Sequence, residues 1–294
     1  MTKAYQVAGH VFHLELPDTS SLWGNLDQYE PFEVQLSPDP VFTLKLVRSL
    51  PDVPMETVYD APVEPGETVV KLYRAGDEWQ FEMAPNDKYP VVGKMRTGSD
   101  FRNGELFIDS RMMGDAIFAI NNSLMLQFAF CTSCLGTLEM HASVIRNSGK
   151  GYLFLAKSGT GKSTHSSLWL KHIPGSELLN DDNPVVRVWP DGRVIVYGSP
   201  WSGKTPCYKN IECPVGAFVR IRRSPDNRIT PLSLIESYAI LYSSSSGFKA
   251  DRKMGDGLHE TLEKVAVSTP CYVLDCRPDE EAARVCSSKV MQDE

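Results

Sequence analysis

The stretch from Gly151 to Thr164 constrains this chain more than any other, because it has the pattern of a phosphate-binding loop. An apolar run, Tyr152 to Leu155, predicts a buried strand, and Lys162 opens a segment that predicts a helix through Leu170. Two glycines lie in the loop between them. A glycine-containing loop between a strand and a helix N-terminus is the context in which backbone N–H groups bind an anion.

The residue types of this loop match the motif G-x-x-x-x-G-K-[ST] except at its first position, where Ala156 replaces glycine. Ala156 fits there only if its φ is negative. The Lys162 ammonium is expected on the β- and γ-phosphates, and the Ser163 hydroxyl is expected to bind Mg²⁺. The pattern therefore predicts ATP and Mg²⁺ as ligands. The residues predicted to bind them from this loop are Ser158, Gly159, Thr160, Gly161, Lys162, Ser163 and Thr164.

A pair of carboxylates, Asp181 and Asp182, follows a second apolar run at Leu178-Leu179. The length of the whole segment predicts a strand–helix–strand unit with parallel strands. Because ligands collect at the carboxyl ends of such strands, both carboxylates are expected beside Lys162 and Ser163. One carboxylate, assigned to Asp181, would bind Mg²⁺, and the other would take a proton from a hydroxyl acceptor. The residues alone leave open which aspartate is the base, and an acidic turn is the alternative interpretation.

Two more residues are candidates because of their position. His141 lies on a predicted strand that a tight turn joins to the strand of the phosphate loop, so it is expected beside the loop. A structural role for this histidine remains equally open. Lys204 closes a second glycine-bounded loop and is a candidate phosphate contact, with a plain surface turn as the alternative. The hairpin pattern at Val185–Tyr197 predicts a mixed sheet.

The chain as a whole predicts a β-rich region followed by an α/β core. Residues 1–110 contain repeated short strands with Pro, Gly, Asn and Asp turns, which indicates an antiparallel sheet of unknown role. An apolar, methionine-rich connecting helix is expected over residues 111–135, and the nucleotide-binding core over 136–294. Within that core the pattern predicts a helix over residues 257–267 and a strand at Cys271–Cys276.

Composition excludes several classes of protein. The net charge of −7 over 294 residues argues against a general nucleic-acid or anionic-membrane binder. The sequence has neither an apolar run of 18 residues nor a signal-like start, and its seven cysteines form no regular framework, so a cytoplasmic location without a membrane partner is expected. Cys131 and Cys134 are interpreted as buried helix residues without a metal. The oligomeric state, including a homo-oligomer, is left open.

Four segments occur in an order and spacing that resemble the catalytic core of the HPr kinase/phosphorylase family and its wider superfamily with the phosphoenolpyruvate carboxykinases. They are Met140–Ser143, Ala156–Thr164, Asn180–Asn183 and Gly198–Lys204. The resemblance covers about residues 136–290. It implies a mixed-sheet α/β kinase core of the phosphate-loop type and ATP- and Mg²⁺-dependent phosphoryl transfer to a serine hydroxyl. It also implies that His141 is the active-site histidine and that Asp181 and Asp182 are the metal-ligand and base pair.

Three activities agree with these residues. The first is a kinase whose acceptor is a hydroxyl-bearing protein, peptide or small molecule. The second is a nucleotide-binding sensor or partner module without catalysis. The third is a carboxykinase-like lyase, which the sequence disfavours because no additional metal-binding Lys/His set or substrate-clamping arginine accompanies the motifs. The kinase is the prediction that uses all of the candidate residues.

Overall fold

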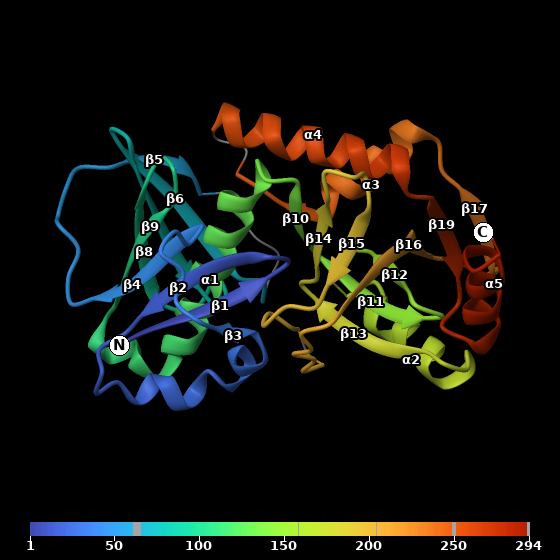
Figure 1. The fold of residues 1–294 in the computed structure, drawn as a ribbon, viewed down its shortest axis with the longest axis horizontal. Helices are drawn as coiled ribbons and strands as arrows, with labels where there is room; N and C mark the ends of the chain where they lie inside the picture. Colours follow the sequence, from blue (N-terminus) through green and yellow to red (C-terminus); the bar gives the residue numbers. More distant parts are fainter. Residues whose placement is uncertain (61–65, 158, 204, 249–250, 293–294) are drawn as a thin grey trace. The chain divides into compact units, whose positions relative to one another are not determined.

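A computed structural model describes residues 1–60, 66–157, 159–203, 205–248 and 251–292 of the chain. The chain divides into two compact units, Met1–Cys131 and Thr132–Glu294. Each unit contains one mixed sheet, and the first unit is rich in strands (Figure 1). The prediction of an α/β protein with a mixed-sheet core and a β-rich N-terminal region is therefore confirmed at this level. The boundary between the units falls after residue 131, whereas residue 110 was the predicted end of the first region.

The described residues of the first unit form a nine-stranded sheet in the order β3-β1-β2-β4-β9-β8-β7-β6-β5. The strands are β1 (Thr2–Val7), β2 (His10–Glu15), β3 (Glu33–Val34), β4 (Phe42–Val47), β5 (Glu56–Tyr59), β6 (Val69–Ala75), β7 (Glu78–Ala84), β8 (Gly93–Gly98) and β9 (Asn103–Ile108).

This sheet is not antiparallel throughout, which corrects the expectation for residues 1–110. β4 pairs in parallel with β2 on one side and with β9 on the other. Two 3₁₀ helices, η1 (Ser21–Asn25) and η2 (Asp27–Phe32), lie between β2 and β4 and let the chain cross back before β4 begins. Parallel neighbours need such a crossover, and the sequence pattern gave no helical signal for this short one.

Most of the apolar helix belongs to the first unit, and the boundary between the units falls within its last turn. After η3 (Ser110–Asp115) it forms α1 (Ala116–Ser133), which lies against β8 and β9. A side chain at Gly93 would come within 2.6 Å of the Ala119 methyl group, so glycine allows the helix and the strand to approach closely. Residues 110–133 have the length and mean hydropathy of a membrane span, but 61% of that window is buried, as a core helix requires.

The described residues of the second unit form a ten-stranded sheet with two arms that share one long strand, β16. One arm has the order β13-β11-β12-β16-β19-β17, and the other the order β16-β15-β14-β10-β18. The strands are β10 (Thr137–Met140), β11 (Ala142–Asn147), β12 (Lys150–Leu155), β13 (Glu177–Asp182), β14 (Val185–Val188), β15 (Val194–Tyr197), β16 (Glu212–Arg223), β17 (Arg228–Pro231), β18 (Ser245–Ser246) and β19 (Cys271–Cys276).

Helices cover both faces of the first arm (Figure 1). They are α2 (Lys162–His172), α3 (Leu234–Ser243), α4 (Arg252–Ser268) and α5 (Glu280–Val290). On one face Trp169 of α2 and Cys286 of α5 are buried against Phe154 of β12. On the other face Leu241 of α3 and Leu262 of α4 belong to a separate buried cluster. The sheet therefore has an apolar layer on each side, as expected for buried strands of an α/β fold.

Strand direction fixes which chain segments meet at one edge. β16 lies between β12 and β19 and is parallel to both. β11 is antiparallel to both β12 and β13. β13 therefore runs in the direction of β12, as predicted, but β11 lies between them. The carboxyl ends of β12, β13, β16 and β19 all reach the edge at which β11 begins. Residues just after four strands and just before a fifth thus come together there.

Candidate functional site

The loop that follows β12 takes its shape from two glycines. Gly159 has φ +70° and Gly161 has φ +129°, a backbone region that other residues rarely adopt. Ala156 is not among the residues with positive φ, so the missing first glycine of the motif is not required by this backbone. Ser158, one of the predicted ligands, lies outside the described residues.

The N-terminus of α2 faces a cavity of about 490 Å³ at this edge of the sheet. The cavity is lined by His141, Gly159, Gly161, Lys162, Ser163, Thr164, Asp181, Asp182 and Gly203. Gly161 precedes the helix, and none of the described side chains caps its first turn. The N–H groups of a helix N-terminus and the helix dipole favour an anion at this position.

A chain of three side chains crosses this cavity. The Lys162 Nζ atom lies 2.6 Å from His141 Nε2 and 3.4 Å from the carbonyl oxygen of Ala156. An ammonium group has only donors, so Nε2 must accept and the ring proton must be on Nδ1. The His141 Nδ1 atom lies 3.0 Å from Asp182 Oδ1 and donates its hydrogen bond to that oxygen. Strand β11 brings His141 into the chain because it begins at Ala142, directly after the histidine.

For both Lys162 and Asp182, burial and the neighbouring charges act on the pKa in opposite directions. Burial lowers the pKa of the Lys162 ammonium, and Asp182 and Asp181 oppose that effect. For Asp182, burial acts to raise the pKa, but the hydrogen bond from His141 and the charge of Lys162 outweigh it and lower the pKa. Asp182 is therefore an ionised carboxylate at neutral pH, and Lys162 is a partly desolvated cation beside it.

The two aspartates have different partners. The Ser163 hydroxyl lies 3.2 and 3.1 Å from the two carboxylate oxygens of Asp181, which is only 3% exposed. Asp182 contacts His141 instead and has φ +108°, an uncommon backbone conformation for a residue other than glycine. Such conformations occur mostly where the surroundings hold a functional residue in place. The structure therefore separates a hydroxyl–carboxylate pair at Ser163 from a histidine–carboxylate pair at Asp182.

The second glycine-bounded loop, which includes Ser202 and Gly203, forms hydrogen bonds with the backbone of the aspartates. The Asp181 carbonyl oxygen accepts hydrogen bonds from Gly203 N at 2.7 Å and from Ser202 Oγ at 3.0 Å. A side chain at Gly203 would come within 2.9 Å of Asp182 Cβ, so glycine is needed for this close contact. Ser202 thus holds the aspartate backbone in place. Lys204, the predicted phosphate contact of this loop, lies outside the described residues.

A second cavity, of about 460 Å³, is also lined by the glycine loop that follows β12. Its lining includes Thr160, Thr164, Leu168, Ile221, Arg223 and Cys276. Thr160 therefore faces this cavity and is absent from the lining of the first one, whereas Thr164 lines both. Apolar side chains from three elements form part of its wall.

Arg223 is a loop contact that the sequence did not reveal. Its Nη2 donates to the Gly159 carbonyl oxygen at 2.6 Å and its Nε to that of Thr160 at 3.2 Å. The sequence shows only a basic run at 220–228, and the structure distributes that run: Arg222 forms an ion pair with Asp275. Only the pairing of β16 beside β12 brings Arg223 to the loop, and this pairing has no local sequence signal.

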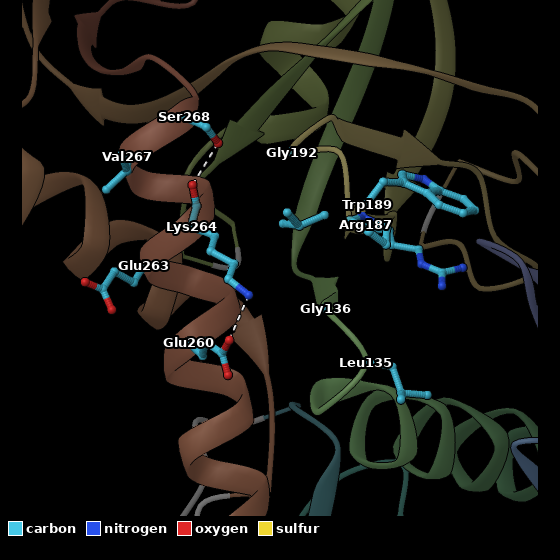
Figure 2. Close-up of a pocket in the computed structure, with 12 residues that line it drawn as sticks. Leu135, Gly136, Arg187, Trp189, Gly192, Glu260, Glu263, Lys264, Val267 and Ser268 are labelled. Carbon is cyan, nitrogen blue, oxygen red and sulfur yellow. Dashed lines mark hydrogen bonds and ion pairs between the residues drawn. The ribbon is translucent and has the colours of Figure 1, made fainter.

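A larger cavity, of about 830 Å³, lies between α4 and the turn that joins β14 and β15 (Figure 2). Its lysine, Lys264, is paired with Glu260 at 2.7 Å, and Val267 is exposed on the same helix. None of the predicted site residues lines it. Size alone does not define a chemical site, so the candidate chemistry remains at the smaller cavity with the cation, the carboxylates and the helix N-terminus.

Comparisons with known proteins add little. No family model matches the chain, and no curated protein matches it. The solved structure of the Hpr(Ser) kinase/phosphatase from Coxiella burnetii is similar to this chain with a TM-score of 0.31 and 12% identity, over 52% of this chain and 88% of that one. A TM-score this low carries no argument about function, so the geometry of the site must carry it.

Proposed function

We propose that the second unit is a kinase core of the phosphate-loop type that transfers the γ-phosphoryl group of ATP, with Mg²⁺, to a hydroxyl acceptor. One observation carries the proposal: a glycine loop with its lysine, a hydroxyl–carboxylate pair and a histidine–carboxylate pair all line one cavity of about 490 Å³. Phosphoryl transfer needs these three functions, namely phosphate binding, metal binding and orientation of the acceptor. The order of these motifs along the chain, which resembles the HPr kinase family, agrees with it.

The residues present fit a magnesium ion that is shared with phosphate. Within the described residues no cluster of three His, Cys, Asp or Glu side chains could hold a metal alone. Mg²⁺ usually has one or two protein oxygens and completes its shell with phosphates and water. Ser163 and Asp181 would supply those oxygens, since they lie within hydrogen-bond distance of each other. Bound there, the ion would neutralise negative charge on the phosphates during transfer.

The remaining groups have distinct roles in this proposal. The loop N–H groups and Lys162 hold the phosphates. Asp182 and His141 orient the acceptor hydroxyl and accept its proton. The nucleoside would extend into the cavity of about 460 Å³, whose wall includes Leu168 and Ile221 and which shares loop residues with the phosphate cavity. The acceptor is a hydroxyl-bearing protein, peptide or small molecule.

Label transfer from γ-³²P-ATP with Mg²⁺ into lysate proteins, peptides and small metabolites tests the proposal. Wild-type protein should label an acceptor. Asp182→Asn should bind ATP with unchanged affinity but lose most of the transfer, since general acid–base groups contribute about 10²- to 10⁴-fold. If wild-type protein binds ATP but neither transfers nor hydrolyses it, and loss of the aspartates changes nothing, the kinase proposal is wrong and a nucleotide sensor is favoured.

A further inference from the structure

The ammonium group of Lys162 and the Nε2 atom of His141 contact each other in this structure. The motif assigns the Lys162 ammonium to nucleotide phosphates, yet here it lies 2.6 Å from His141 Nε2. Because the ring proton is on Nδ1, Nε2 carries the only lone pair of the imidazole that can accept a proton. The contact therefore uses the lysine that should bind phosphate and, at the same time, blocks the one basic atom of the histidine.

The other end of the imidazole is built to support a base at Nε2. Asp182 Oδ1 accepts from Nδ1 at 3.0 Å, which fixes the tautomer and the ring orientation. A carboxylate in this position also stabilises the imidazolium that forms when Nε2 takes a proton. Asp182 is itself held through the neighbouring Asp181 carbonyl by Gly203 and Ser202. The histidine thus has an oriented lone pair on the cavity side and a carboxylate behind it.

We propose that His141 Nε2 is the atom that takes the proton of the acceptor hydroxyl, and that Lys162 blocks it until nucleotide phosphates draw the ammonium away. This inference rests on the proposed function and deepens it. Phosphate oxygens compete for the ammonium because their negative charge attracts it, whereas the imidazole that they replace is neutral. The base therefore becomes available only when the phosphoryl donor is bound.

The transfer step then balances within the groups named. The hydroxyl proton moves to His141 Nε2, and the acceptor oxygen forms a bond to the terminal phosphorus. The bond between that phosphorus and the bridging oxygen breaks, and its electron pair leaves on the nucleoside diphosphate. The imidazolium, stabilised by Asp182, returns its proton to solvent.

The block predicts that removal of the histidine has two opposite effects. In His141→Ala the ammonium no longer has to leave a ring nitrogen, so AMP-PNP with Mg²⁺ should bind about three- to tenfold more tightly by calorimetry, the range of one net hydrogen bond. Transfer to the acceptor should fall at least about 100-fold. His172→Ala is the matched control because His172 lies at the far end of α2, beside Glu280, and both quantities should match wild type.

A second readout follows the blocked atom directly. In protein labelled with ¹⁵N-histidine, the Nε2 signal of His141, assigned by its loss in His141→Ala, should shift when AMP-PNP and Mg²⁺ are added. In Lys162→Met the same signal should already differ from that of nucleotide-free wild type, because no ammonium contacts the ring.

Unchanged or weaker AMP-PNP binding by His141→Ala would overturn the inference, and so would an Nε2 signal that is identical in wild type and Lys162→Met. Retention of full transfer by His141→Ala would also refute it, while the kinase proposal would stand as long as wild type transfers phosphate. A wild-type chain that binds no AMP-PNP would overturn both.

Discussion

Glu139 is a buried carboxyl group that should make the stability of the second unit depend on pH. It lies on β10, is 1% exposed, and pairs with Val185 on one side and Ser246 on the other. Burial raises its pKa to about 7, against the opposing effects of Ser246 and His141, and Asp182 adds to the rise. We predict that Glu139→Gln removes a destabilisation that grows as the pH rises from about 4.5 to 7 and is fully present above that range.

The sign follows from proton binding in the two states. Between pH 4.5 and 7 the unfolded chain loses this proton first, so the folded state binds more protons and the free energy of unfolding decreases as the pH rises. Each tenfold change in proton affinity corresponds to about 1.4 kcal/mol. A carboxyl group with a pKa of about 7 when folded and 4.5 when unfolded therefore costs about 3 kcal/mol of stability above pH 8.

Urea unfolding of wild type and Glu139→Gln at pH 5 and pH 8.5, followed by tryptophan fluorescence, measures this difference. The variant should gain about 2.5 kcal/mol relative to wild type between the two pH values, because the glutamine amide never ionises and a small part of the cost is already present at pH 5. Glu263→Gln, on an exposed face of α4, is the matched control and should follow wild type within about 0.5 kcal/mol. If Glu139→Gln retains the pH dependence of wild type, the assignment of a raised pKa to this carboxyl group is refuted.

Three substitutions test the loop and its support. Lys162→Ala should abolish tight binding of Mg·ATP by calorimetry, and an unchanged affinity would remove the loop from the proposed function. Gly161→Ala, at φ +129°, should strain the loop by about 1–3 kcal/mol, which should lower the free energy of unfolding by up to that amount, and should weaken ATP binding at least tenfold; equal affinity would contradict this. Gly198→Ala would place a side chain 1.9 Å from the Lys209 carbonyl oxygen, so we expect a loss of about 1–3 kcal/mol in urea unfolding, and wild-type stability would show that this segment moves freely.

Local patterns predicted the elements around the loop well. The tight turn before β12 consists of Ser148 at φ +50° and Gly149 at φ +78°, the geometry that a two-residue hairpin requires. Helix α2 begins at Lys162 as expected, and the strand predicted at Cys271–Cys276 is β19. These features depend on residues close together in the sequence, so periodicity and turn residues are sufficient to locate them.

Features set by distant contacts were missed. α4 begins at Arg252, five residues before the expected start, where the Asp251 side chain caps it by accepting from Met254 N. Gly257 lies inside the helix, although glycine is unfavourable there. It allows a close approach to Cys134, since a side chain at Gly257 would come within 2.7 Å of the sulfur. The insertion of β11 between β12 and β13 also depends on pairing that no local pattern specifies.

The sequence was sufficient to predict which residues would form the candidate site, but not which of their side chains would contact each other. The motif and the strand directions indicated that Lys162, Ser163, His141 and both aspartates would lie at one edge. They did not indicate which aspartate would contact which partner, and the structure shows Asp181 beside Ser163 and Asp182 beside His141. The lysine–histidine contact had no sequence signal, because it depends on the conformation of two side chains that belong to different elements.

The shared strand β16 has a consequence for how the second unit is made in the cell. β12 pairs with β11 immediately through its hairpin, but on its other side Gly151 pairs with Val215, and β16 pairs in turn with the still later β19. During synthesis the glycine loop after β12 therefore emerges long before β16 and β19, which complete its edge of the sheet. Pairing over such sequence distances is slow, so the nascent chain would expose the free edge of an apolar hairpin until β16 emerges, and the edge of β16 until β19 emerges. Such exposed edges favour aggregation, so this unit is expected to depend on chaperones.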